Sequence, residues 1–384
     1  INQYNRSLGG DFAIPLMPYG ETWRRNRGLF QQKFRSSNLP TFRPMEYEKA
    51  HEMVKSFMKE PDDFFVHVKN YIVGITMNIA YGYRPSRDRD RTLELADETI
   101  CLLKNNLFKA IIMQAFPPLY SILEWFPGSN EWGVRAQKMV DELLDLPFQF
   151  VQSEISKGTA QTSFTSDQLD HTGDLKGPEL RDKHRRIKEV AANIHLGQFG
   201  TDTMNAALLS FIQSMVLHQD AQKKAQAEID RVVGHERLPG LSDRESLPYV
   251  EALYKEVLRY RPVTPLGIPH AATEDFLYNQ HCLPEKAVVI ANVWAMSRDE
   301  RVYSTPEEFL PERFLTADGN LNDDDNIPLI YGFGRRVCVG RLLAEDTLWI
   351  AIALTLATCD ITHKTDANGR LIDVEGTLLP DSVV

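Results

Sequence analysis

The stretch from Tyr331 to Arg341, YGFGRRVCVGR, contains the residue types that could hold a thiolate beside a large ligand. Its glycines at 332, 334 and 340 permit a tight loop in which the backbone can approach a flat group closely. Cys338 comes just before an expected helix, whose N-terminal N–H groups and dipole favour a thiolate. A lone cysteine is more often an inert small hydrophobe. The surrounding glycines, together with the positive charge of Arg336, reverse those odds.

In each of two further pairs, the two residues lie about one helical turn apart. Glu256 and Arg259 place a carboxylate and a guanidinium at i, i+3, where they share a helix face. If this pair were exposed, it would contribute little to stability. Trp23 and Arg27 place an indole N–H donor and a guanidinium fork on one face of another helix. With the neighbouring arginines, that face could equally be a solvated basic surface.

A long helical pattern, from about residue 180 to 218, carries the polar pair Asp202 and Thr203. A hydroxyl beside an acid inside a helix disturbs the backbone hydrogen-bond ladder and can open a groove. The pair could therefore act as a general acid or organise water. Alternatively, Thr203 only hydrogen-bonds a carbonyl one turn earlier. Only Gly197 and Gly200 interrupt the pattern, and a helix of this length usually crosses the whole body of an enzyme.

These candidate residues need a mostly helical scaffold to position them. Apolar residues at three- and four-residue spacing predict helices, and short β signals at 275–278 and 287–291 are joined through Pro284. Residues 158–177 have the polar composition of an exposed loop. The sequence predicts a mainly α protein with small β-sheets and no βαβ array. The other expected helices cover residues 21–34, 64–81, 90–106, 133–157, 219–233, 246–260 and 341–358.

The overall composition limits the possible classes of function. The chain has 384 residues, of which 43% are hydrophobic and 25% are charged, as in ordinary globular proteins. Its net charge of −10 argues against a nucleic-acid-binding surface. The four cysteines include no C-x-x-C pair, which disfavours a disulfide scaffold and a structural zinc site. No apolar run reaches the roughly 18 residues of a membrane span.

The cysteine loop resembles the haem-binding signature of the cytochrome P450 family, F-x-x-G-x-R-x-C-x-G. The sequence matches it at Gly334, Arg336, Cys338 and Gly340, whereas Tyr331 replaces the usual phenylalanine and Val339 a frequent proline. The resemblance implies that Cys338 is the thiolate ligand of the iron of haem b. It also implies the family's fold, in which the haem lies between a long central helix and the cysteine loop.

Other segments match the family's motifs in the family's order. Glu256 and Arg259 correspond to its E-x-x-R pair, which would be buried and joined by Arg313 in a structural triad. The family's W-x-x-x-R motif is matched by Trp23 and Arg27. These two residues would bind the haem propionates, and the resemblance assigns the same role to His270 and Arg336.

The segment FGTDTM, residues 199–204, aligns with the family's A-G-x-D-T-T. By this resemblance, Asp202 and Thr203 would help to deliver protons to bound oxygen. Two positions depart from the motif: Phe199 replaces a small residue and Met204 replaces a threonine. The ring of Phe199 could fill space meant for oxygen or substrate, or it could turn away and pack in the core.

The resemblance implies a monooxygenase that inserts one oxygen atom of O₂ into a lipophilic small molecule. Its electrons would come from NADPH through a diflavin reductase. Two alternatives stay open: a catalytically impaired haem-binding fragment, and a relative that rearranges substrates or uses peroxides without a reductase. The Asp202–Thr203 pair argues against the peroxide-using relative. The motifs look most like those of fungal members that tailor secondary metabolites.

The likeness extends from near Phe12 to near Leu379, so we expect one domain over residues 1–384. We also expect this domain to be truncated, without the family's N-terminal anchor, first helix and opening strands, and shortened at its C-terminal end. For the full-length family member, the resemblance implies membrane association at the cytoplasmic face of the endoplasmic reticulum.

Overall fold

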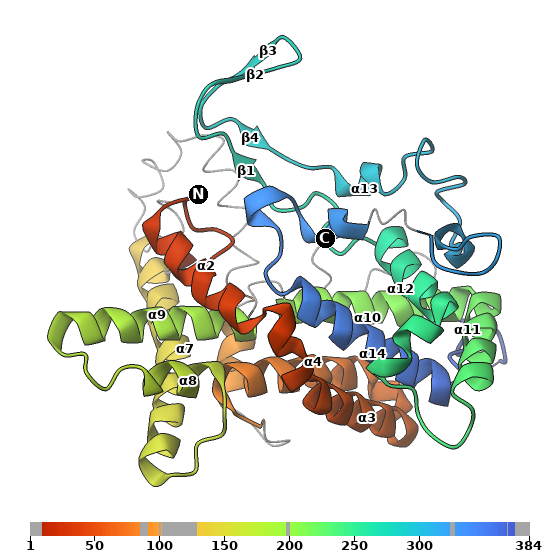
Figure 1. The fold of residues 1–384 in the computed structure, drawn as a ribbon, viewed down its shortest axis with the longest axis horizontal. Coiled ribbons are helices and arrows are strands. Elements are labelled where there is room, and N and C mark those ends of the chain that lie inside the picture. The colour runs from red at the N-terminus through yellow and green to blue at the C-terminus, as the bar shows by residue number, and fades with distance from the viewer. Residues whose placement is uncertain are drawn as a thin grey trace. The chain divides into compact units, whose positions relative to one another are not determined.

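The structure, a computed structural model, describes residues 10–84, 91–99, 101, 129–196, 200–322, 327–366 and 368–372 (Figure 1). Helices dominate these residues, which also contain four short strands. Packing divides the chain into two compact units. The first unit comprises Ile1–Phe42 and Ile72–Thr201, and the second comprises Arg43–Tyr71 and Asp202–Val384. The boundaries fall within α4 (Phe64–Tyr81) and near the start of α10 (Gly200–Leu217).

The first unit is built around α9 (Gly177–Leu196), which packs against α2 (Glu21–Lys33), α7 (Ser129–Lys157) and α8 (Phe164–Asp170). Polar groups on the buried face of α9 hold its neighbours. Asn26 of α2 donates a hydrogen bond to Glu189 at 2.8 Å. Asn193 accepts the N–H of Ile14 at 3.0 Å and donates to the carbonyl of Phe12 at 2.9 Å. These contacts attach α2 and the segment before it to α9.

The second unit is built around α14 (Arg341–Thr358), whose apolar sequence is buried over almost its whole length. It packs against α3 (Arg43–Lys59), α11 (Gln219–Val232) and α12 (Pro248–Tyr260). A short helix, α13 (Val293–Met296), follows the strands. None of the helices described here is long and apolar enough to cross a membrane.

The strands form two separate two-stranded antiparallel sheets (Figure 1). β1 (His270–Ala271) pairs with β4 (Val288–Val289), and β2 (Phe276–Tyr278) pairs with β3 (His281–Leu283). The sequence predicted strands at the positions of β2 and β4 and joined them through Pro284, but each of these strands has another partner. The reason is a tight turn at Asn279 and Gln280, which both adopt positive φ and return the chain directly after β2.

Most predicted helices occur in the structure, and α14 has the predicted bounds. The pattern predicted from about 180 to 218 is present as α9 and α10, and residues 197–199 between them lie outside the described residues. One prediction was wrong: the polar segment 158–177 was expected to be a loop but contains α8. The hydroxyls of Ser163 and Ser166 form a capping box that starts this helix, and Phe164 buries its ring.

Candidate functional site

The cysteine loop runs from the end of η6 (Ile327–Tyr331) through η7 (Gly334–Arg336) to the start of α14. Gly332 and Gly334 have φ values of 80° and 54°, which side chains with a Cβ rarely adopt. These turns bring the chain back on itself, so that the N–H of Cys338 donates to the carbonyl of Tyr331 at 2.8 Å. The glycines of the motif therefore have a backbone role that the sequence predicted.

The face of this loop is open. Cys338 is exposed. A Cβ built on Gly334 or Gly340 would meet no described heavy atom within 4 Å beyond the adjoining chain. Gly340 is the N-cap of the 18-residue helix α14, so its helix dipole points its positive end toward the cysteine segment. An exposed thiol near the positive end of a helix dipole is suited to bind a large electrophilic partner.

Tyr331 connects the start of the loop to α12. Its hydroxyl lies 3.2 Å from the hydroxyl of Tyr254, which is buried in α12. Its ring lies under the guanidinium of Arg341, 5.4 Å from the ring centroid. Burial raises the pKa of both tyrosines, so both hydroxyls stay protonated and one donates to the other. Sequence reasoning missed Tyr254, because its place in the sequence is that of an ordinary core residue of an amphipathic helix.

The structure brings Glu256, Arg259 and Arg313 together in one network. The Arg259 guanidinium forms a fork on the Glu256 carboxylate, with N–O distances of 2.6 and 2.8 Å. Arg313, from η5 (Pro311–Phe314), reaches the same carboxylate at 3.2 Å. The side chains of Glu256 and Arg259 are 0% and 2% exposed. An exposed and weak ion pair is therefore excluded for these residues.

The two arginines also hold a segment that has no helix or strand of its own. Arg259 donates to the carbonyls of Ser297, Pro306 and Glu308, and Arg313 donates to those of Ser304, Thr305 and Glu308. The backbone N–H of Leu310 also donates a hydrogen bond to the Glu256 carboxylate, with an N–O distance of 2.7 Å. Every charge in the network thus has both an opposite charge and hydrogen bonds, which is the condition for burying charge.

Trp23 and Arg27 lie on the buried face of α2 in the first unit. They are 5% and 7% exposed, and the guanidinium of Arg27 lies 5.3 Å from the centroid of the Trp23 ring. Trp23 also packs with Ile14 and Met17. The pair is therefore not a solvated basic surface, which was the alternative left open by the sequence.

The other predicted residues of the second unit are placed as follows. Asp202 and Thr203 are half-buried in the first turn of α10. Met204 is 7% exposed, so its side chain is core. His270 is exposed at the start of β1, and Arg336 is half-buried at the end of η7. Phe199 lies outside the described residues.

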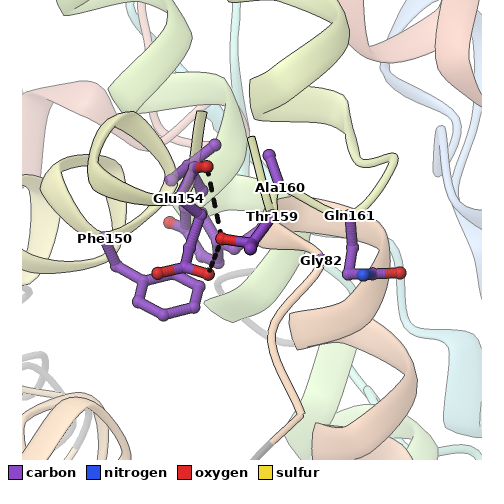
Figure 2. Close-up of a pocket in the computed structure, with 8 residues that line it drawn as sticks. Gly82, Phe150, Glu154, Thr159, Ala160 and Gln161 are labelled. Atoms are coloured by element: carbon purple, nitrogen blue, oxygen red, sulfur yellow. Dashed lines mark hydrogen bonds between the residues drawn. The ribbon is translucent and has the colours of Figure 1, made fainter. Parts of the chain in front are cut away.

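A small cavity of about 30 Å³ in the first unit has no part in this site. Gly82, Phe150 and Gln161 lie around it (Figure 2). Beside it, the Thr159 hydroxyl donates a hydrogen bond to the Glu154 carboxylate, with an O–O distance of 2.7 Å. A space of this size holds about one water molecule, and none of the candidate residues lines it.

Comparison with known proteins identifies the family. The family model for cytochrome P450 matches residues 7–382. Cytochrome P450 monooxygenase 136 of Postia placenta is 36% identical over 362 residues, which cover 92% of this chain and 67% of that protein. Cytochrome P450 monooxygenase ple1 of Rhodocybe pseudopiperita is 36% identical over 370 residues, which cover 95% of this chain and 70% of that protein.

The fold agrees with this result. A zebra fish cytochrome P450, solved with progesterone, superimposes with a TM-score of 0.73. The match covers 98% of this chain and 84% of that one at 23% sequence identity, and it therefore bears on the fold alone. The loop around Cys338, the buried E-x-x-R network and these similarities lead to one conclusion. The chain belongs to the cytochrome P450 family and is a monooxygenase of that type.

Proposed function

We propose that this chain is a haem-thiolate monooxygenase in which Cys338 binds the haem iron. Membership of the family implies a haem cofactor. The observation that supports this assignment is the exposed thiol of Cys338 on a loop whose glycines leave the adjoining space open. A sulfur donor with an open face fits a flat macrocycle, whereas a cysteine buried in the core would not.

The charged and polar residues named above would bind the rest of the haem. Trp23 and Arg27 offer an indole N–H and a guanidinium, and His270 and Arg336 offer two further donors for the propionates. Bound haem supplies the activation of O₂, since a thiolate ligand favours O–O cleavage. The triad of Glu256, Arg259 and Arg313 would act on stability only, since it holds the segment that follows α13.

Asp202 and Thr203 are proposed to move protons toward the oxygen site. Both stand half-buried in the first turn of α10, so their side chains keep partial access to solvent. The overall reaction would convert a substrate C–H bond, O₂, two electrons and two protons into an alcohol and water. A relative that uses peroxides would not need this proton supply, so the Asp202–Thr203 pair favours the oxygen-dependent reaction.

The electrons are proposed to come from an NADPH-dependent diflavin reductase, and the substrate is proposed to be a lipophilic small molecule. Leu266 and Ile268, in the segment that precedes β1, are 53% and 38% exposed, which offers apolar surface to such a substrate. We also propose a role in secondary metabolism, because the motifs resemble those of fungal members that tailor secondary metabolites. By the same resemblance, we propose the endoplasmic reticulum membrane as the location of the full-length protein.

The test is the absorption spectrum of haem-reconstituted protein after reduction and addition of carbon monoxide. The intact chain should give the red-shifted Soret band of a thiolate complex, and Cys338→Ser should eliminate it. Cys282→Ser removes another exposed thiol, on β3, and should leave the band in place. An unchanged band in Cys338→Ser would overturn the ligand assignment. Turnover with NADPH and reductase, compared with peroxide alone, then separates the two reaction types.

A further inference from the structure

We propose that the hydroxyl pair of Tyr331 and Tyr254 is a clamp that fixes the cysteine loop on α12. This inference rests on the proposed function, because it makes both tyrosines positioning residues for the iron ligand Cys338. The two hydroxyl oxygens are 3.2 Å apart. Tyr254 is 2% exposed, so its hydroxyl depends on partners within the protein.

Tyr331 acts on both ends of the loop. Its backbone carbonyl accepts the N–H of Cys338 at 2.8 Å, which ties the cysteine to the residue that begins the loop. Its ring lies against the guanidinium of Arg341, the first residue of α14. Arg341 is itself held by Glu345 at 2.6 Å. A change in the position of Tyr331 would therefore shift both the cysteine and the start of the helix behind it.

Tyr254 reaches α14 by a second route. The guanidinium of Arg244 lies 5.6 Å from the centroid of its ring. Arg244 forms a fork on Glu251 of α12, at 2.8 and 2.9 Å, and reaches Asp346 of α14 at 3.4 Å. Tyr254 is thus linked to the element before the cysteine through Tyr331, and to the helix after it through Arg244. The loop is held at both ends by one residue of α12.

The hydroxyl of Tyr331 is the part that the family motif does not supply, because phenylalanine usually stands at this position. With phenylalanine at 331, the buried hydroxyl of Tyr254 would lose its partner in the loop. The net loss of one hydrogen bond changes an equilibrium about fivefold. We expect a change of about this size in the opening of the loop.

The experiment uses the full chain and the variants Tyr331→Phe, Tyr254→Phe and the double variant. The first readout is amide hydrogen exchange of residues 331–341 without haem, which requires no assumption about iron. The second is the fraction of haem-loaded protein with the thiolate-type spectrum. Tyr249→Phe is the matched control, since it removes a hydroxyl from the same helix that also makes a 3.2 Å hydrogen bond, but to Glu312.

We expect each single variant to exchange about fivefold faster in the loop and to lose thiolate-type spectrum sooner on heating. The double variant should be no worse than the single ones, because both changes remove the same hydrogen bond. Loop exchange equal to that of Tyr249→Phe in both single variants would overturn the clamp. The variants could show the expected increase in loop exchange while the haem-loaded intact chain gives no thiolate-type spectrum. In that case the clamp holds and the proposed function fails.

Discussion

Two carboxyl groups of the second unit are almost completely buried, and the protein treats them in opposite ways. Glu256 is 0% exposed and receives hydrogen bonds from two guanidiniums and one backbone N–H. Glu46, on α3, is 1% exposed and accepts one hydrogen bond, from Thr347 of α14 at 2.6 Å. Its second oxygen has no hydrogen-bond partner among the described residues. The two sites show that burial fixes the penalty for charge, whereas the partners decide whether the charge is kept.

The pKa of Glu46 follows from this environment. Burial raises it from 4.5 to about 7, with a further rise from nearby Asp346, while the hydrogen bond from Thr347 and the charge of Arg43 act against the rise. Glu46 is therefore about half protonated at pH 7 and mostly protonated at lower pH. Glu256 instead accepts hydrogen bonds from Arg259, Arg313 and the N–H of Leu310. One carboxyl group changes its charge near neutral pH, and the other anchors two arginines.

The largest effect should come from Glu256→Gln. This change leaves two buried guanidiniums without their counter-charge, and breaking a buried pair in this way costs about 3–5 kcal/mol. We expect a loss of this size in the free energy of unfolding, measured by urea denaturation. Glu52→Gln is the control, because Glu52 makes an i, i+3 pair with Lys49 on the surface of α3. Equal losses in the two variants would show that burial of the pair does not matter.

The next effect is the pH dependence caused by Glu46. Between pH 4.5 and 7, the unfolded chain loses a proton from this group that the folded chain keeps. The folded state favours the protonated form of Glu46. The stabilisation that this preference provides is therefore fully present below that window and is lost as pH rises through it. The total change is roughly 3 kcal/mol.

Glu46→Gln should remove this dependence. Its stability relative to the parent chain should increase by roughly 3 kcal/mol as pH passes from below to above the window. The measurement is chemical denaturation at a pH on each side of the window. Glu52→Gln, on the same helix, should keep the parent's pH profile. A parent chain whose profile matches that of Glu46→Gln would show that Glu46 ionises normally.

The smallest effect should come from Arg313→Lys, which keeps the positive charge beside Glu256 but loses the fork. The lysine cannot reach the carbonyls of Ser304, Thr305 and Glu308 together. The loss of these hydrogen bonds should lower the free energy of unfolding by about 1–2 kcal/mol. Arg301→Lys, at an exposed arginine, is the control for thermal denaturation. No difference between the two variants would mean that charge alone holds the segment.

The sequence predicted the fold and the positions of the helices better than it predicted which charged side chains are buried. The bounds of α14 were predictable, because Gly340 precedes a segment without glycine or proline that contains the largely apolar stretch 349–357. The spacing of Glu256 and Arg259 predicted a shared helix face. Their burial depends on chain segments about fifty residues away, which no local pattern reports. Arg313 was found only through the resemblance to the family.

Glu46 and Tyr254 were missed for a common reason. Glu46 stands among the charged residues of MEYEKAHEM, a segment for which no helix was predicted and in which α3 forms. Tyr254 fits the apolar side of an amphipathic helix. In both cases the side chain gains its role from a contact with α14 or with the loop before it. Such contacts come from tertiary packing, and a sequence pattern with a period of one helical turn cannot reveal them.

The network around Glu256 has a consequence for the order in which the chain folds. The segment from Ser297 to Leu310 contains no helix or strand, and its carbonyls are held by guanidiniums anchored on α12. Closing a chain excursion of this length before any local structure forms is entropically slow. We therefore expect the segment to become ordered only after α12 has docked, so that it is the last protease-sensitive stretch of the second unit during refolding.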